Sequence, residues 1–150
     1  MDLIDAVVIS HNHYDHMDLG TLKQFPDDMT YFVPLGNKDW ILSNVSAKAN
    51  VYEMDWWDEV EIKHGIKVCC LPCQHFSNRG LTDRNKTLWS SWGVVTNKFR
   101  YYFAGDTGYR SIPRGTTDLT QLDKLPYCPA FKEIGDKYGP FQFASIPIGT

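Results

Sequence analysis

The sequence predicts an α/β sandwich, built by one chain of 150 residues. Short apolar runs of strand length recur along the chain, and stretches of helical length separate the first three of them. Later runs are joined in pairs by turn residues, which indicates hairpins. Strands that alternate with helices and hairpins favour a layered α/β fold over a helical bundle or an all-β barrel. Hydrophobic residues make up 43% of the chain, enough for the core of one domain over residues 1–150.

The first third of the chain predicts three strands separated by two helices. The expected order is strand 5–10, helix 18–25, strand 30–34, helix 36–44 and strand 51–54. Asp18 is the expected N-cap of the first helix, because an aspartate there can accept a hydrogen bond from an amide of the first turn. The first strand leads directly into a polar cluster from His11 to Asp18. Such clusters at strand ends are candidate sites.

The rest of the chain predicts two hairpins, a helix and a final strand. The expected hairpins are 60–71, with its turn at 64–65, and 91–104, with its turn at 97–98, and a polar loop over 72–87 separates them. Residues 110–127 contain two prolines and no periodic pattern, so we expect a loop there. A helix over 129–138 and a buried strand over 143–148 are expected to follow.

Composition and charge argue against several functions. The net charge of −3 offers no basic surface for a phosphate backbone, so nucleic acid is not an expected partner. No run approaches the roughly 20 apolar residues that cross a bilayer, and the first residues lack the pattern of a signal peptide. We therefore expect an intracellular protein that does not span a membrane. Cys69, Cys70 and Cys73 are crowded together, which predicts free thiols rather than a disulfide framework.

The strongest pattern is the segment His11-Asn-His13-Tyr-Asp15-His16, which directly follows a predicted strand. It holds three of the five histidines in the chain. Imidazole nitrogens and carboxylate oxygens are ligands that zinc takes at catalytic sites. His11 and His13 can share one metal ion, and Asp15 and His16 can reach a second ion about 3.5–4 Å from the first. A polar turn with hydrogen-bonded histidines is the alternative interpretation.

Two further candidate ligands follow later strands. His75 lies in Pro-Cys-Gln-His75, and Asp106 lies in Ala-Gly-Asp106-Thr. A carboxylate between two divalent ions can offer an oxygen to each, which suits Asp106, and His75 would complete the first metal site. An ordinary loop histidine is the alternative for His75. His64 precedes a glycine at a predicted turn, where we expect an exposed structural role.

Two other groups of residues have competing interpretations. Cys70 and Cys73 have the spacing of a zinc knuckle, but the sequence has no second pair, so a buried structural role is favoured. The five tryptophans can belong to the core, or some can line an acyl-chain groove or a membrane interface. The core is favoured for each of them.

The order of these motifs resembles the metallo-β-lactamase superfamily, in which a His-x-His-x-Asp-His segment precedes an isolated histidine and a Gly-Asp-Thr-Gly segment. Within that superfamily, several segments resemble the N-acylphosphatidylethanolamine-hydrolysing phospholipase D family. These segments are Asp5–His16, Phe32–Gly36, Asp55–Trp57, Phe103–Tyr109, Cys128–Gly135 and Ile146–Gly149. The resemblance implies a metallo-β-lactamase αββα sandwich, and we expect a partial one that lacks the opening strands and the C-terminal part.

The resemblance also implies two zinc ions as the cofactor and assigns their ligands. The first ion would be held by His11, His13 and His75, and the second by Asp15 and His16, with Asp106 bridging the two. Asp15, His16 and Asp106 would be the catalytic residues. The family places a further histidine later in the chain, and none follows His75 here, so the second site is expected to be incomplete. The same ligand types also accept iron or manganese.

The reaction that the resemblance implies is hydrolysis of N-acylphosphatidylethanolamine, which releases N-acylethanolamine and phosphatidic acid. The implied partners are a phospholipid substrate and a membrane, bound peripherally on its cytoplasmic side, and we also expect a homodimer. Two alternatives stay open, since the ligands specify a metal more than a substrate. One is another hydrolase of the superfamily, such as a lactonase or a nucleotide phosphodiesterase. The other is a catalytically inactive fragment or isoform.

Residues 110–127 depart from the family pattern. In the family, the Gly-Asp-Thr-Gly-Tyr segment, which ends here at Tyr109, passes directly into the Cys-Pro-Ala-Phe segment, which begins here at Cys128. We interpret residues 110–127 as an insertion into the domain. Two hypotheses explain it: a loop specific to this lineage, or a stretch retained by alternative splicing or by gene prediction.

Overall fold

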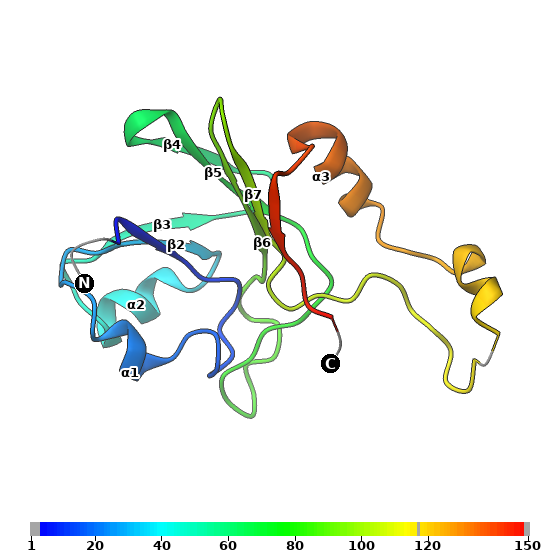
Figure 1. Cartoon of the computed structure of the whole chain (residues 1–150). Helices are drawn as coiled ribbons and strands as arrows, with labels where there is room; N and C mark the ends of the chain where they lie inside the picture. Colours follow the sequence, from blue (N-terminus) through cyan, green and yellow to red (C-terminus); the bar gives the residue numbers. More distant parts are fainter. Residues whose placement is uncertain (1–3, 117, 149–150) are drawn as a thin grey trace.

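The computed structural model describes residues 4–116 and 118–148. The helices and strands pack in four layers, which are two short helices, a parallel sheet, a mixed sheet and a third helix (Figure 1). In chain order the elements are β1 (Ala6–Val8), α1 (Leu19–Leu22), β2 (Thr30–Pro34), α2 (Lys38–Asn44), β3 (Asn50–Met54), β4 (Glu59–Ile62), the 3-10 helix η1 (Lys63–Gly65), β5 (Ile66–Leu71), β6 (Ser91–Val95), β7 (Arg100–Phe103), the 3-10 helix η2 (Leu119–Lys124), α3 (Ala130–Tyr138) and β8 (Phe143–Ser145).

The first sheet contains β1, β2 and β3 in that order, and all three strands are parallel. Parallel neighbours need a crossover connection, which α1 and α2 supply on the same face of the sheet (Figure 1). Tyr31 and Val33 of β2 face these helices and pack with Leu22 and Ile41. The intervening Phe32 points to the opposite face, toward the second sheet.

The second sheet has the strand order β4-β5-β6-β7-β8, and its pairs are antiparallel except for β7 and β8. Cys69 and Leu71 of β5 face α3 and form a core with Ile134. Val68 and Cys70 of the same strand face the first sheet instead. Because side chains alternate along a strand, both faces of β5 are buried, one under a helix and one under a sheet.

The core between the two sheets contains Trp92 of β6, which is fully buried. Its indole N–H donates to the backbone carbonyl of Ile9 at 3.0 Å, and its ring packs edge-on against Phe32. This hydrogen bond joins the chain just after β1 to the second sheet, next to the His11–His16 segment. The three cores between four layers confirm the predicted α/β sandwich.

Most of the predicted elements form, with differences at their ends. Asp18 caps α1 as predicted and accepts a hydrogen bond from the Thr21 amide at 2.7 Å, but the helix ends early, at Leu22. The prediction of a buried last strand is wrong, because β8 is short and Phe143 is 59% exposed. The physical reason is that β8 pairs only with β7 at the edge of the sheet, where side chains have fewer neighbours.

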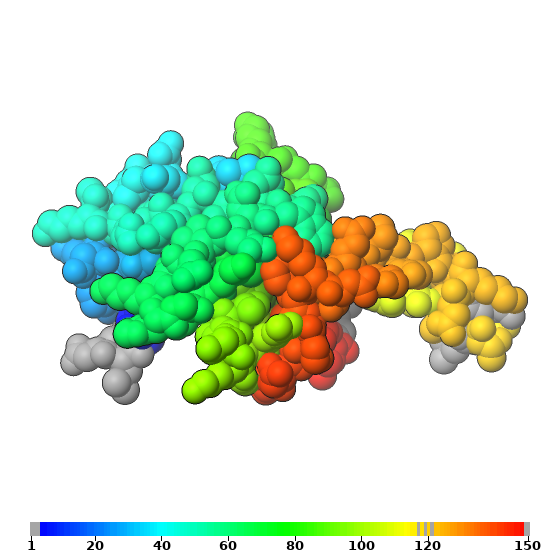
Figure 2. Space-filling model, turned by 90° about the horizontal axis from the view of Figure 1, so that it is seen from above, coloured from blue at the N-terminus to red at the C-terminus, as the bar shows by residue number. Residues whose placement is uncertain are grey.

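The described residues of 110–127, the predicted insertion, project from the sandwich as an arm (Figures 1 and 2). An antiparallel bridge between Arg110 and Tyr127 closes the base of the arm, and the Cys128 amide donates to the Tyr109 carbonyl at 3.2 Å. The sequence predicted no regular structure here, but η2 forms within the arm, because a side chain caps its first turn. The two ends of the arm therefore meet at its base, next to the sandwich.

The cysteines and most of the tryptophans have the structural roles that were favoured. All four cysteines are free thiols, as predicted, and burial raises the pKa of Cys69 to about 11 and that of Cys70 to about 12. Four tryptophans pack in or against the three cores: Trp40, Trp56, Trp57 and Trp92. The core interpretation therefore holds for these four side chains.

Candidate metal centre

The side chains predicted to bind metal meet beyond the ends of three strands. The chain after β1 carries the His11–His16 segment, the chain after β5 carries His75, and the chain after β7 carries Asp106. Gly105 brings two of these segments into contact, since a Cβ added to it would lie 2.6 Å from the Cβ of Ser10. Its φ of +60° also favours glycine. Residues far apart in the sequence therefore form one site.

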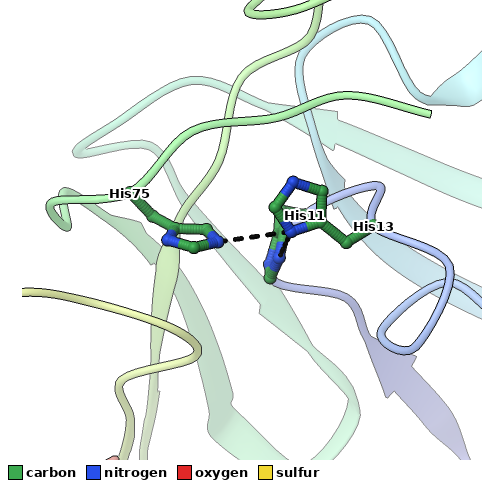
Figure 3. A group of neighbouring side chains, drawn as sticks. All are labelled: His11, His13 and His75. Carbon is green, nitrogen blue, oxygen red and sulfur yellow. Dashed lines mark hydrogen bonds between the residues drawn. The ribbon is translucent and has the colours of Figure 1, made fainter. Parts of the chain in front are cut away.

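Three histidines make up the first group of candidate ligands, and their nitrogens converge (Figure 3). The Nε2 atom of His11 lies 2.8 Å from Nδ1 of His13, and the Nε2 atom of His75 lies 3.3 Å from the same Nδ1. The rings meet edge to face, with centroids of His11 and His75 4.5 Å apart. Three imidazole nitrogens in this arrangement match the histidine set of catalytic zinc sites that keep an open position.

A second group contains His11, His16 and Asp106. The Nε2 atom of His16 lies 3.2 Å from Oδ2 of Asp106, and the Nε2 atom of His75 lies 3.8 Å from the same oxygen. The Asp106 carboxylate, a member of the second group, therefore also lies close to His75 of the first group and can reach a metal ion in either of them. Because a carboxylate has two oxygens with several lone pairs, it can serve both ions at once.

Asp15 lies at the margin of this arrangement. Its Oδ2 atom is 3.5 Å from Nε2 of His16, but its side chain is 80% exposed, and it belongs to neither of the two groups. The sequence predicts that Asp15 and His16 share a metal ion. Of these two residues, the structure places only His16 among the converging ligand atoms.

The environment of the site favours the neutral form of His11 and His75. Burial, followed by the charges of the neighbouring His16, His13 and His75 in that order, lowers the pKa of His11 to about 3. Burial also lowers the pKa of His75, which Asp106 partly offsets. A neutral imidazole has a free lone pair, which is the form that binds metal. Imidazole nitrogens and one carboxylate are a donor set that fits divalent zinc, so the residues present fit the cofactor that the fold implies.

Sequence reasoning missed the residues that hold these ligands in place. The Ser10 hydroxyl lies 2.9 Å from Nδ1 of His11, and the amide oxygen of Asn78 lies 2.9 Å from Nε2 of His13. Arg79 donates to the backbone carbonyl of Asn12, within the histidine segment, and to that of Met17, directly after it. The position of Ser10 directly before His11 was an available signal. Asn78 and Arg79 lie in the loop predicted over 72–87 and had no local signal.

A sandwich of two sheets between helices, with histidines and an aspartate gathered beyond strand ends, defines the metallo-β-lactamase-fold class. Comparison with known families agrees, because the model described as "Beta-lactamase superfamily domain" matches residues 1–150. The chain belongs to this superfamily, and the family resemblance seen in the sequence is confirmed.

Two curated relatives are phospholipases by name. The chain is 38% identical over 156 residues to N-acyl-phosphatidylethanolamine-hydrolyzing phospholipase D 1 of Caenorhabditis elegans, a match that covers 98% of this chain and 39% of the relative. It is 37% identical over 111 residues to the mitochondrial enzyme of that name from Saccharomyces cerevisiae, which covers 70% of this chain and 23% of the relative. The chain thus spans well under half the length of these proteins.

Solved structures share the fold at low sequence identity. A metallo hydrolase from the archaeon Ignicoccus hospitalis superposes with a TM-score of 0.65 and 19% identity, over 97% of this chain and 52% of that protein. An isothiocyanate hydrolase from Delia radicum gut bacteria gives a TM-score of 0.58 and 19% identity, over 92% of this chain and 47% of that protein. These likenesses confirm the fold.

Proposed function

We propose that the protein is a zinc-dependent phosphodiester hydrolase that releases N-acylethanolamine and phosphatidic acid from N-acylphosphatidylethanolamine. The observation that carries the proposal is the convergence of two groups of candidate ligands that share His11, with the Asp106 carboxylate of the second group also close to His75 of the first. The names of the nematode and yeast relatives support the choice of substrate.

In this proposal each side chain of the site has a defined task. His11, His13 and His75 would hold the first ion, Asp15 and His16 would contribute to the second, and Asp106 would serve both. When bound, zinc supplies Lewis acidity, which activates water near neutral pH and offsets the negative charge of a phosphoryl group. Asp106 and Asp15 reduce the repulsion between two divalent ions, because each places a negative charge next to them. Asp15, His16 and Asp106 are the proposed catalytic residues.

A phospholipid substrate implies that the protein works at a membrane surface. We propose peripheral association with the cytoplasmic side of an intracellular membrane. Among the helices that the structure describes, none is long and apolar enough to cross a bilayer. The yeast relative is mitochondrial by name, and the homodimer expected from the family resemblance stays a prediction.

The proposal is tested by measuring metal content and hydrolysis on the same purified chain. Elemental analysis is expected to find between one and two zinc ions per chain, because the second site lacks the further histidine that the family places later in the chain. Vesicles that contain N-acylphosphatidylethanolamine are expected to release N-acylethanolamine only when zinc is present. Asp106→Asn should remove both the second ion and turnover, whereas Asp27→Asn, which changes an aspartate 71% exposed elsewhere on the surface, should change neither.

The other outcomes separate the alternatives. If the chain hydrolyses a lactone or a nucleotide phosphodiester but not the phospholipid, the proposed substrate is wrong and the proposed metal centre is supported. Two bound ions without turnover on any of these substrates would indicate a catalytically inactive form. A chain that binds no divalent metal would contradict the proposal as a whole.

A further inference from the structure

Asn78 contacts the outer nitrogen of one proposed metal ligand. Its Oδ1 atom lies 2.9 Å from Nε2 of His13. The other nitrogen of that ring, Nδ1, faces the Nε2 atoms of His11 and His75 at 2.8 and 3.3 Å (Figure 3). His13 thus presents a different nitrogen to the centre from its two partners, and Asn78 occupies the nitrogen that points away.

The hydrogen-bond partners of Asn78 determine which nitrogen of His13 carries the hydrogen. The Nδ2 group of Asn78 donates to the carbonyl of Gly80 at 3.4 Å, which leaves Oδ1 directed at His13. A carbonyl oxygen only accepts, so the Nε2 atom of His13 must be the N–H donor. In a neutral imidazole the other nitrogen, Nδ1, then has a free lone pair, and that lone pair points to the centre.

The loop that carries Asn78 is fixed by its own hydrogen bonds. The hydroxyl of Ser77, a fully buried residue, donates to the carbonyl of Thr87 at 2.6 Å. The Ser77 carbonyl accepts from the amide of Asn85 at 2.7 Å. These two bonds tie the start of the loop to its end, so the position of Asn78 is set before any metal ion binds.

Arg79 attaches the same loop to the histidine segment. Its Nη1 donates to the carbonyls of Asn12 and Met17 at 3.1 and 2.9 Å. Its guanidinium lies over the rings of Tyr14 and Trp40, 4.3 Å from each centroid. The segment that carries His13 is therefore held against the loop that carries Asn78, and the contact between these two side chains does not depend on one hydrogen bond alone.

We propose that Asn78 is a positioning residue that selects Nδ1 of His13 as the metal-binding atom. The inference extends the proposed zinc site and rests on it, since a fixed tautomer matters only if the ring binds an ion. Removal of such an outer hydrogen-bond partner typically weakens metal binding by about 10–100-fold. We expect that loss for Asn78→Ala, and we expect Asn78→Asp, which keeps an acceptor oxygen, to retain most of the affinity.

The first test is the tautomer of His13 in the metal-free protein. Two-bond proton–nitrogen correlation spectra of the histidine rings, recorded above neutral pH, distinguish the two neutral tautomers. The expected result is the Nε2–H form in the wild-type chain and in Asn78→Asp, and a mixture of forms in Asn78→Ala. A wild-type ring in the Nδ1–H form would overturn the proposal, and this readout needs no bound metal.

The second test is zinc affinity, measured by competition with a chromophoric chelator. Asn78→Ala is expected to bind about 10–100-fold more weakly than wild type, with recovery in Asn78→Asp. Asn97→Ala, which changes an exposed asparagine at the β6–β7 turn, is the matched control and should bind like wild type. Unchanged affinity and tautomer in Asn78→Ala would overturn the proposal. If the wild-type chain has the expected tautomer but binds no zinc, the proposed function is contradicted. The role of Asn78 in fixing the tautomer of His13 would still be supported.

Discussion

Replacement of Gly105 by alanine tests whether close backbone contact assembles the site. The φ of +60° at this residue costs a non-glycine side chain about 1–2 kcal/mol. The new Cβ would also lie 2.6 Å from the Cβ of Ser10, and relief of such overpacking costs about 1–3 kcal/mol. We therefore expect Gly105→Ala to lower the free energy of unfolding by about 2–5 kcal/mol, measured by urea denaturation followed by circular dichroism.

The matched control separates strain from the clash. Gly65 has a similar φ of +68°, but an added Cβ would meet no atom within 4 Å. Gly65→Ala should therefore cost only the backbone strain, about 1–2 kcal/mol. In a double-mutant cycle, Ser10→Gly should recover the additional cost of Gly105→Ala, because it removes the Ser10 Cβ with which the new Cβ clashes. Equal losses for the two alanine variants would refute the reasoning.

Three further predictions concern the scaffold. Hydrogen bonds, led by the one from Lys67, lower the pKa of Glu59 from 4.5 to about 2. Glu59→Gln should therefore lower the free energy of unfolding by up to about 1 kcal/mol near neutral pH. Urea denaturation at a series of pH values should show this difference disappear as the pH falls from about 4.5 to about 2. Trp92→Phe should cost about 1–3 kcal/mol in the same assay, since the carbonyl of Ile9 loses its buried donor. Deletion of 110–127 should change the free energy of unfolding by less than about 1 kcal/mol and leave zinc content unchanged by elemental analysis, because the ends of the arm already meet.

The layers of the fold could be predicted because they depend on local patterns. The alternation of buried side chains in β2 and β5 and the cap at Asp18 are readable within a few residues. The exposure of Phe143 could not be predicted, because its apolar pattern is that of a buried strand. Whether a strand is central or at an edge depends on strand order, which no local pattern contains.

The candidate site divides in the same way. The sequence could predict three of the candidate ligands, His11, His13 and His16, because they lie within one short segment directly after a strand. The structure places them together. His75 and Asp106 were predicted from position in the sequence, and their convergence is a consequence of the sandwich. The marginal place of Asp15 was not predictable, since the spacing of the motif does not say which side chains of a loop point inward.

Candidate ligands are easier to predict from the sequence than the residues that hold them in place. A ligand must be one of a few residue types, so a cluster of histidines is informative on its own. A supporting residue only needs to present one acceptor or donor, which most polar side chains can do. Asn78 therefore looks like any loop asparagine until the fold brings it against His13, 65 positions away in the sequence. We therefore expect that substitutions in the loop of Asn78 and Arg79 can change the metal affinity of the proposed site while every candidate ligand is retained.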